Sequence, residues 1–345
     1  MKRKVLIIYT GGTIGMVNDP KTKTLVPFDF ENITKNVPEL RRFNFIVKSL
    51  SFNPIIDSSA MEPDIWIRLG KIIEDNYHSF DGFVILHGTD TMAFTASALS
   101  FMLHNLRKSV ILTGSQLPLG DIRTDGKENL LTALEIAAAH KNGASLVPEV
   151  CIYFQDFLFR GNRTSKFNAE NFRAFHSYNY PPLAEAGVNI KYNFPYIRYK
   201  TDNSPFHAVK SLDRNVALLK IFPGITQNVV EAILNSQGIK AVVLETFGSG
   251  NAPTHKWFLD AIKKAIENNI IILNVTQCLT GSVNMLRYKT GINMLEAGVI
   301  SGYDITTETA ITKLMYLLAN SKSKEYIISG LNKSLKGEAT ILLLS

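Results

Sequence analysis

Short apolar segments alternate with amphipathic helical patterns along most of the chain, and this alternation limits the folds that the chain can adopt. Apolar segments that we predict as strands lie at 5–9, 82–86, 110–113, 150–154, 216–221, 241–245 and 270–275. Helical spacing is found at 63–77, 92–106 and 128–140, and a further helix is expected at about 307–318. Strands separated by helices are typical of βαβ units and a mostly parallel sheet. We therefore predict an α/β fold.

The periodic pattern breaks down from residue 177 to about residue 212, where Tyr, Asn and Pro are frequent. A chain of 345 residues also suits two domains better than one. We predict a larger N-terminal catalytic domain at 1–190, built on a doubly wound, mostly parallel, Rossmann-like sheet. A linker at 191–212 and a smaller C-terminal α/β domain at 213–345 would follow.

The composition argues against several classes of partner. The formal net charge is +7, but Lys and Arg are scattered and the longest cluster lies at a terminus, so we expect a solvated basic surface and no nucleic-acid partner. Cys151 and Cys278 each lie in an apolar stretch, which favours buried reduced thiols over a disulfide scaffold. The seven His residues lack HxxxH spacing, so no zinc site is expected. Without a leader or a run of ~20 apolar residues, we expect a cytoplasmic protein that does not contact membranes.

The strand at 5–9 ends in the run TGGTIG, residues 10–15. Its spacing is neither GxGxxG nor GxxxxGK[ST], it contains no lysine and no good helix follows, which argues against a phosphate-binding loop. Residues 16–27 are typical of an exposed loop, which could close over a substrate as a lid. The alternative is a structural turn in which Thr13 is incidental.

The strand at 82–86 ends in a second threonine-bearing run, HGTDT at residues 87–91. Thr89 or Asp90 could cap the following helix, and His87 fits a packed strand-end histidine better than a general base. Capping does not explain why two strand ends both carry threonines, at the edge where parallel sheets bind ligands. Shared chemistry does, and we predict amide hydrolysis by a threonine nucleophile.

A lysine follows the strand at 150–154, in the run GNRTSK at residues 161–166. Lys166 could reach the crevice from there. Beside Asp90 it would be partly desolvated and could take a proton from a hydroxyl group. The alternative for Lys166 is an ordinary surface charge.

Six motifs in order carry a family resemblance: TGGTIG (10–15), HGTDT (87–91), TGSQLP (113–118), RTD (123–125), NRTSK (162–166) and GSGNAP (248–253). Together they span nearly the whole chain, which resembles the bacterial-type L-asparaginases of the cytoplasmic type I branch. The resemblance implies a two-domain α/β enzyme that hydrolyses L-asparagine to L-aspartate and ammonia without a cofactor. It also implies a homodimer or homotetramer with active sites at the subunit interface.

The resemblance assigns roles to particular residues. Thr13 would attack the side-chain amide, while Thr89, Asp90 and Lys166 would form a second group in which Lys166 tunes the Thr89 hydroxyl. Asp90 would also hold the α-ammonium of the substrate, and the Thr89 N–H would be an oxyanion donor. The remaining substrate-binding residues would be Asp57, Ser58, Ser59, Gly12, Gly88 and Asn251.

The chain departs from the family pattern in two places. Many members carry a tyrosine in the loop after the first motif, but here that stretch has Leu25, and we expect Tyr303 to supply the phenol. The alternative is that Tyr303 merely precedes the helix at 307. Some type I enzymes bind a second asparagine through an arginine and a cysteine. Cys278 matches the cysteine, but Glu245 stands at the arginine position and would repel a carboxylate, so we expect no such activation.

Two other functions remain open from the sequence. The first is an enzyme of the same family with another preference, such as a glutaminase-asparaginase or a transamidation subunit, because one methylene group gives discrimination of only about 1–3 kcal/mol. The second is a non-catalytic α/β module that binds a small ligand. The sequence also leaves open which threonine attacks first.

Overall fold

The computed structural model describes residues 2–18, 25–27, 37–200 and 203–341, which form two compact units, Met1–Lys210 and Ser211–Ser345. The division falls near the end of the predicted linker. Most of that linker belongs to the first unit, because β15 (Ile190–Tyr192) pairs with β14 (Ala184–Ala186) and β16 (His207–Ala208) pairs with β6 (Leu103–His104). Backbone pairing of short strands, which leaves little period in the sequence, therefore extends the first unit beyond residue 190.

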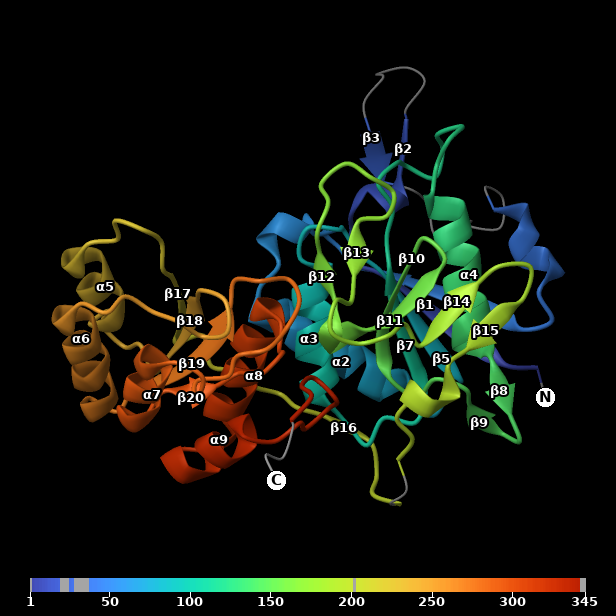
Figure 1. Ribbon diagram of the computed structural model, residues 1–345. Helices are drawn as coiled ribbons and strands as arrows, with labels where there is room; N and C mark the ends of the chain where they lie inside the picture. The colour runs from blue at the N-terminus through green and yellow to red at the C-terminus, as the bar shows by residue number, and fades with distance from the viewer. Residues whose placement is uncertain (1, 19–24, 28–36, 201–202, 342–345) are drawn as a thin grey trace. The chain divides into compact units, whose positions relative to one another are not determined.

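The first unit is built on an eight-stranded sheet with the order β15-β14-β11-β10-β7-β5-β1-β4 (Figure 1). Five strands are mutually parallel: β4 (Ile46–Ser51), β1 (Lys4–Tyr9), β5 (Gly82–Leu86), β7 (Ser109–Thr113) and β10 (Val150–Phe154). β11 (Phe157–Arg160), β14 and β15 continue the sheet in antiparallel pairing. The carboxyl ends of the parallel strands consequently meet at one edge.

Helices cover both faces of this sheet. α2 (Pro63–Asn76) and α3 (Met92–Met102) pack on one face, and α4 (Gly126–Ala138) packs on the other. Successive residues of β1 alternate between the two cores: Ile7 lies in the core that contains α4, and Ile8 lies in the core that contains α2 and α3. The predicted doubly wound, mostly parallel sheet is confirmed, and burial on both faces explains why its strands are apolar runs.

The second unit contains a four-stranded parallel sheet of β17 (Val216–Lys220), β18 (Ala241–Thr246), β19 (Ile271–Thr276) and β20 (Ile300–Ser301). Its helices are α5 (Gln227–Leu234), α6 (Lys256–Glu267), α7 (Lys289–Glu296), α8 (Thr307–Asn320) and α9 (Lys324–Leu331). The predicted smaller α/β domain is therefore present. A buried ion pair fixes the segment after α9, because Lys313 Nζ of α8 lies 2.7 Å from Glu338 Oε1.

Several local features differ from the predictions. α3 ends at Met102, four residues early, because the chain enters β6 and then turns at Asn105 with a φ of 58°. β2 (Met16–Asn18) and β3 (Leu25–Pro27) pair as an antiparallel hairpin where a loop was expected, and residues 19–24 of that loop lie outside the described residues. Short hairpins also form between β8 (His140–Lys141) and β9 (Ala144–Ser145), and between β12 (Ser165–Lys166) and β13 (Phe175–His176).

The two cysteines lie in different environments. Cys151 is buried in β10, as predicted, and burial raises the pKa of its thiol well above the usual value. Cys278 is exposed, because β19 ends at Thr276 and the cysteine lies in the turn that follows. The prediction that it is buried in a strand was wrong. None of the helices within the described part of the chain has the length and apolarity needed to cross a membrane.

Candidate active site

The first two motifs lie side by side at the carboxyl edge of the large sheet. Thr10, directly after β1, donates from both its backbone N–H and its Oγ1 to the Leu86 carbonyl of β5, each at 3.0 Å. Thr13 lies in the 3₁₀ turn Thr13–Gly15, and Thr89 lies in the turn between β5 and α3. A phosphate-binding loop would lead into a helix here, and β2 follows instead.

The backbones of the two turns touch one residue before each threonine. Gly12 has a φ of 91°, and a Cβ atom at this position would lie 2.4 Å from Gly88 N and 2.5 Å from Gly88 Cα. A Cβ atom on Gly88 would in turn lie 2.4 Å from Ser58 Oγ. Glycine is therefore required twice, since only its bare Cα permits this approach. The result brings the segments that carry Thr13, Thr89 and Ser58 together.

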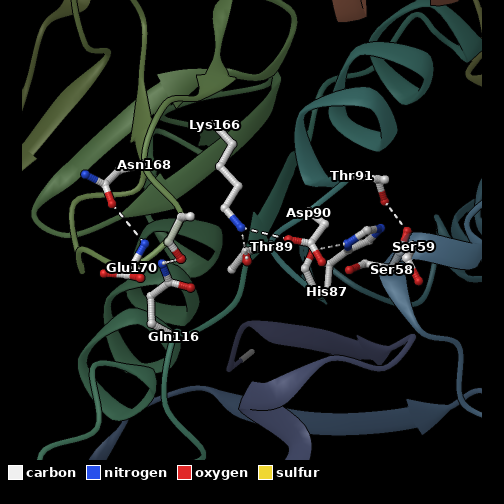
Figure 2. Close-up of polar contacts among 12 residues, drawn as sticks. Ser58, Ser59, His87, Thr89, Asp90, Thr91, Gln116, Lys166, Asn168 and Glu170 are labelled. Carbon is white, nitrogen blue, oxygen red and sulfur yellow. Dashed lines mark hydrogen bonds and ion pairs between the residues drawn. The ribbon is translucent and has the colours of Figure 1, made fainter.

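Lys166 completes a three-residue group with the second motif. Its Nζ atom lies 2.9 Å from Thr89 Oγ1 and 2.8 Å from Asp90 Oδ1 (Figure 2). Lys166 and Asp90 are 76 residues apart in sequence. The lysine side chain is 18% exposed, whereas that of Asp90 is 63% exposed. Lys166 is therefore a half-buried partner of both residues, and the alternative of a plain surface charge does not describe it.

Asp57, Ser58 and Ser59 form a turn beside this group. Asp57 caps the 3₁₀ turn Ser58–Ala60, where its Oδ1 accepts hydrogen bonds from Ser59 N at 2.8 Å and Ser59 Oγ at 2.9 Å. These two bonds favour the ionised form of the Asp57 carboxyl group and lower its pKa. Thr91 Oγ1 donates to Ser58 O at 2.6 Å and ties the turn to the start of α3.

His87 is a structural residue of the strand end. One ring nitrogen lies 2.6 Å from Gly88 O, and the other lies 2.9 Å from Thr95 Oγ1, which also accepts from the Trp66 indole N–H. Complete burial lowers the pKa of His87 to about 4. The interpretation as a packed histidine fits this environment. Thr91 occupies the N-cap position of α3 without a side-chain capping hydrogen bond, so that neither Thr89 nor Asp90 is the N-cap residue.

The remaining predicted residues belong to the second unit. Asn251 forms an isolated bridge with Phe247, and its Oδ1 accepts from Thr290 Oγ1 at 3.3 Å. Tyr303 lies in the turn between β20 and α8 with a φ of 56°, while Thr306 caps α8. Glu245, at the end of β18, accepts a hydrogen bond from Thr307 and lies 3.0 Å from Lys220 Nζ.

Sequence reasoning assigned no role to a buried carboxylate at the start of α4. Asp125 accepts hydrogen bonds from the backbone N–H groups of Gln116 and Leu117, at 3.0 and 3.1 Å. Asn129, one turn later, donates to Gly114 O at 3.0 Å. These two side chains hold the loop after β7, and burial raises the pKa of Asp125 despite its hydrogen bonds. The signal in the sequence was the RTD motif, which carries the aspartate.

A doubly wound sheet with threonines at two adjacent strand ends, followed by a smaller parallel α/β unit, defines a class of two-domain α/β proteins. Residues 4–198 match the family model "Asparaginase, N-terminal", and residues 215–329 match "Glutaminase/Asparaginase C-terminal domain". The chain belongs to the asparaginase family.

Individual relatives agree over the full length. The chain is 42% identical to L-asparaginase 1 of Escherichia coli (strain K12) over 341 residues, which cover 98% of both chains. The crystal structure of L-asparaginase I from Vibrio cholerae is 42% identical, with a TM-score of 0.89 over 99% of this chain and 100% of that one. The thermostable L-asparaginase from Thermococcus kodakarensis is 31% identical, with a TM-score of 0.87 over 98% and 99% of the two chains.

Proposed function

We propose that this protein hydrolyses the side-chain amide of L-asparagine to L-aspartate and ammonia. The observation that carries the proposal is the bridge from Lys166 Nζ to Thr89 Oγ1 and Asp90 Oδ1, next to the contact between Gly12 and Gly88. Membership of the asparaginase family supports the same reaction. No cofactor is needed, because nucleophile, proton acceptor and charge-stabilising groups are all protein groups.

Thr13 is the proposed nucleophile. Its Oγ attacks the carboxamide carbon of asparagine, the C–N bond breaks, and the leaving nitrogen takes up the proton of the hydroxyl group and departs as ammonia. Water then hydrolyses the resulting ester, which releases aspartate and restores the threonine. An unassisted threonine hydroxyl is a weak nucleophile at neutral pH, so that neighbouring groups must carry the proton.

Thr89 and Lys166 provide that proton path in the proposal. Lys166 donates a hydrogen bond to Thr89 Oγ1 and orients this hydroxyl group, so that its oxygen takes the proton of the Thr13 hydroxyl while its own proton passes to the leaving nitrogen. The lysine charge also favours any negative charge that develops on the Thr89 oxygen. The Thr89 N–H would serve as an oxyanion donor, and loss of such a donor typically costs about 2.7–4 kcal/mol.

The substrate is a zwitterion, and the site offers groups for both of its charges. Asp90 retains a largely exposed carboxylate while it binds Lys166, so that it can also accept hydrogen bonds from an α-ammonium group. Asp57 is ionised and would assist there, while Ser58 and Ser59 would donate to the α-carboxylate. Gly12 and Gly88 would contact the substrate through their backbones, while their missing side chains let the two turns and Ser58 meet.

The second unit contributes the finer elements of the proposal. Tyr303 would act beside Thr13 in place of the tyrosine missing at Leu25, and Asn251 would contact the substrate. From the family resemblance we further propose a homodimer or homotetramer with its active sites at the subunit interface, located in the cytoplasm. A Tyr303→Phe variant tests the tyrosine: turnover at saturating asparagine should fall, and near-normal turnover would remove Tyr303 from the mechanism.

Ammonia release from asparagine and glutamine, by the wild type and by Thr13→Ala and Thr89→Ala, tests the function itself. We expect release by the wild type with asparagine preferred, and loss of turnover in both variants. Preference for glutamine would redirect the proposal to a glutaminase. Binding of either amino acid without any ammonia release would indicate a ligand-binding module.

A further inference from the structure

Lys166 stands on a small element that is separate from the main sheet. Strands β12 and β13 contain two residues each, with Lys166 paired to Phe175 and Ser165 paired to His176. A hairpin of this size is not stable by itself. Its base is anchored by the buried Phe175, whose ring centroid lies 5.0 Å from that of Phe154 in β10. Ala174 is buried in the same core and accepts a hydrogen bond from Phe167 N at 2.9 Å. The tip, which is the turn at residues 168–173, extends beyond these anchored residues.

Two amide side chains organise that tip. Asn168 Oδ1 accepts hydrogen bonds from Glu170 N at 2.9 Å and from Asn171 N at 2.8 Å, which fixes the turn internally. Gln116, from the loop after β7, reaches across to the same turn. Its Nε2 donates to Ala169 O at 3.2 Å and to Asn171 O at 3.1 Å (Figure 2). The carboxamide thus uses both of its N–H donors on consecutive parts of one turn.

Gln116 is itself held firmly to the large sheet. Its backbone N–H donates to both oxygens of Asp125, at 3.1 and 3.0 Å, and the adjacent Leu117 N donates to the same carboxylate. Asp125 is buried, and Asn129 bonds both to Asp125 and to Gly114 O. The buried carboxylate of Asp125, at the start of α4, therefore fixes Gln116, which binds the hairpin tip.

We propose that Gln116 is a positioning residue for Lys166, an inference that rests on the role proposed for the lysine. Lys166 Nζ must meet two oxygens of another loop, at 2.9 and 2.8 Å. A shift of the hairpin by about 1 Å would lengthen at least one of these bonds, and a misplacement of that size at a reacting centre can cost about a hundredfold in rate. Gln116 prevents the shift by joining the tip to α4 through Asp125.

Kinetics of Gln116→Ala give the first test. We expect kcat for asparagine to fall by between about tenfold and a hundredfold. KM should change less than kcat, because the Asp57–Ser59 turn is not part of this network. Gln116→Glu should be at least as impaired, since its carboxylate would face two carbonyl oxygens. Asn193→Ala is the matched control: its amide donates to Pro182 O at 3.3 Å elsewhere in the first unit, and kcat should be unchanged.

Hydrogen exchange and a double-mutant cycle distinguish the role of Gln116 in positioning the hairpin from the role of Lys166 in catalysis. In Gln116→Ala, exchange at residues 165–175 should accelerate while the strands of the large sheet keep their protection. Adding Gln116→Ala to Lys166→Ala should cause no further loss of kcat, because the glutamine acts through the lysine. Unchanged exchange, unchanged kcat or an additive loss would each overturn the positioning role. Wild-type kcat in Lys166→Ala alone would instead refute the proposed function of Lys166 and, with it, this inference.

Discussion

Replacing Gly12 with alanine should separate the two threonine-bearing turns. The added Cβ would lie 2.4 Å from Gly88 N, whereas ordinary contacts begin at 3.4 Å, so the turns must move apart by about 1 Å. The φ of 91° adds backbone strain of roughly 1–3 kcal/mol. A 1 Å misplacement of reacting groups can cost about a hundredfold, so we expect kcat/KM for asparagine to fall by about that factor while the protein still folds.

Gly143→Ala provides the matched control for this experiment. Gly143 has a φ of 82° in the β8–β9 hairpin of the same unit, and a Cβ there would meet no atom within 4 Å. Both variants therefore place an alanine at a positive φ, and only Gly12→Ala also forces the turns apart. Ammonia release and thermal unfolding of both proteins should be compared. If Gly12→Ala keeps kcat/KM within about twofold of the control, the contact between the turns does not position the chemistry.

Three further outcomes follow from buried or displaced charges. Burial lowers the pKa of His87 from 6.5 to about 4, so the free energy of unfolding should fall by about 3 kcal/mol as the pH decreases from 6.5 toward 4. In His87→Gln, the free energy of unfolding measured with urea should depend less steeply on pH over this range. The same pH dependence in the variant and the wild type would contradict the burial argument. Glu338→Gln leaves Lys313 buried without its carboxylate and should cost about 3–5 kcal/mol by denaturant unfolding, largely recovered when Lys313→Met is added. Asparagine kinetics should be hyperbolic because Glu245 disfavours a second carboxylate, and sigmoidal kinetics abolished by Cys278→Ser would refute this.

The sequence predicted the parallel cores closely, because strands buried on both faces are continuous apolar runs. β5 and β10 begin and end where the apolar pattern does. It failed where the backbone forms structure without a hydrophobic period. β15 and β16 lie in a stretch rich in Tyr, Asn and Pro. Backbone pairing orders them, β15 with the neighbouring β14 and β16 with β6, which lies about 100 residues earlier in the sequence.

The candidate site shows the same division. Local pattern placed Thr13 and Thr89 at strand ends, which follows from the geometry of a parallel sheet. The place of Lys166 after the strand at 150–154 indicated that it could reach the crevice beside Asp90, and the family resemblance grouped it with Thr89 and Asp90, residues 76 or more apart in sequence. The hydrogen bonds from Gln116 to Ala169 O and Asn171 O could not be predicted from the hydrophobic pattern. Backbone carbonyl groups accept such bonds whatever the side chains of their residues.

The central claim is that hydroxyl groups from two separate turns act as one unit on a single carboxamide. The turnover of asparagine by Thr13→Ala, Thr89→Ala and the double variant tests it most directly. Residues that act together are strongly non-additive, so we expect the double variant to release ammonia no more slowly than the slower single variant. Wild-type turnover in either single variant, or a double variant whose loss equals the product of the two single losses, would contradict the claim.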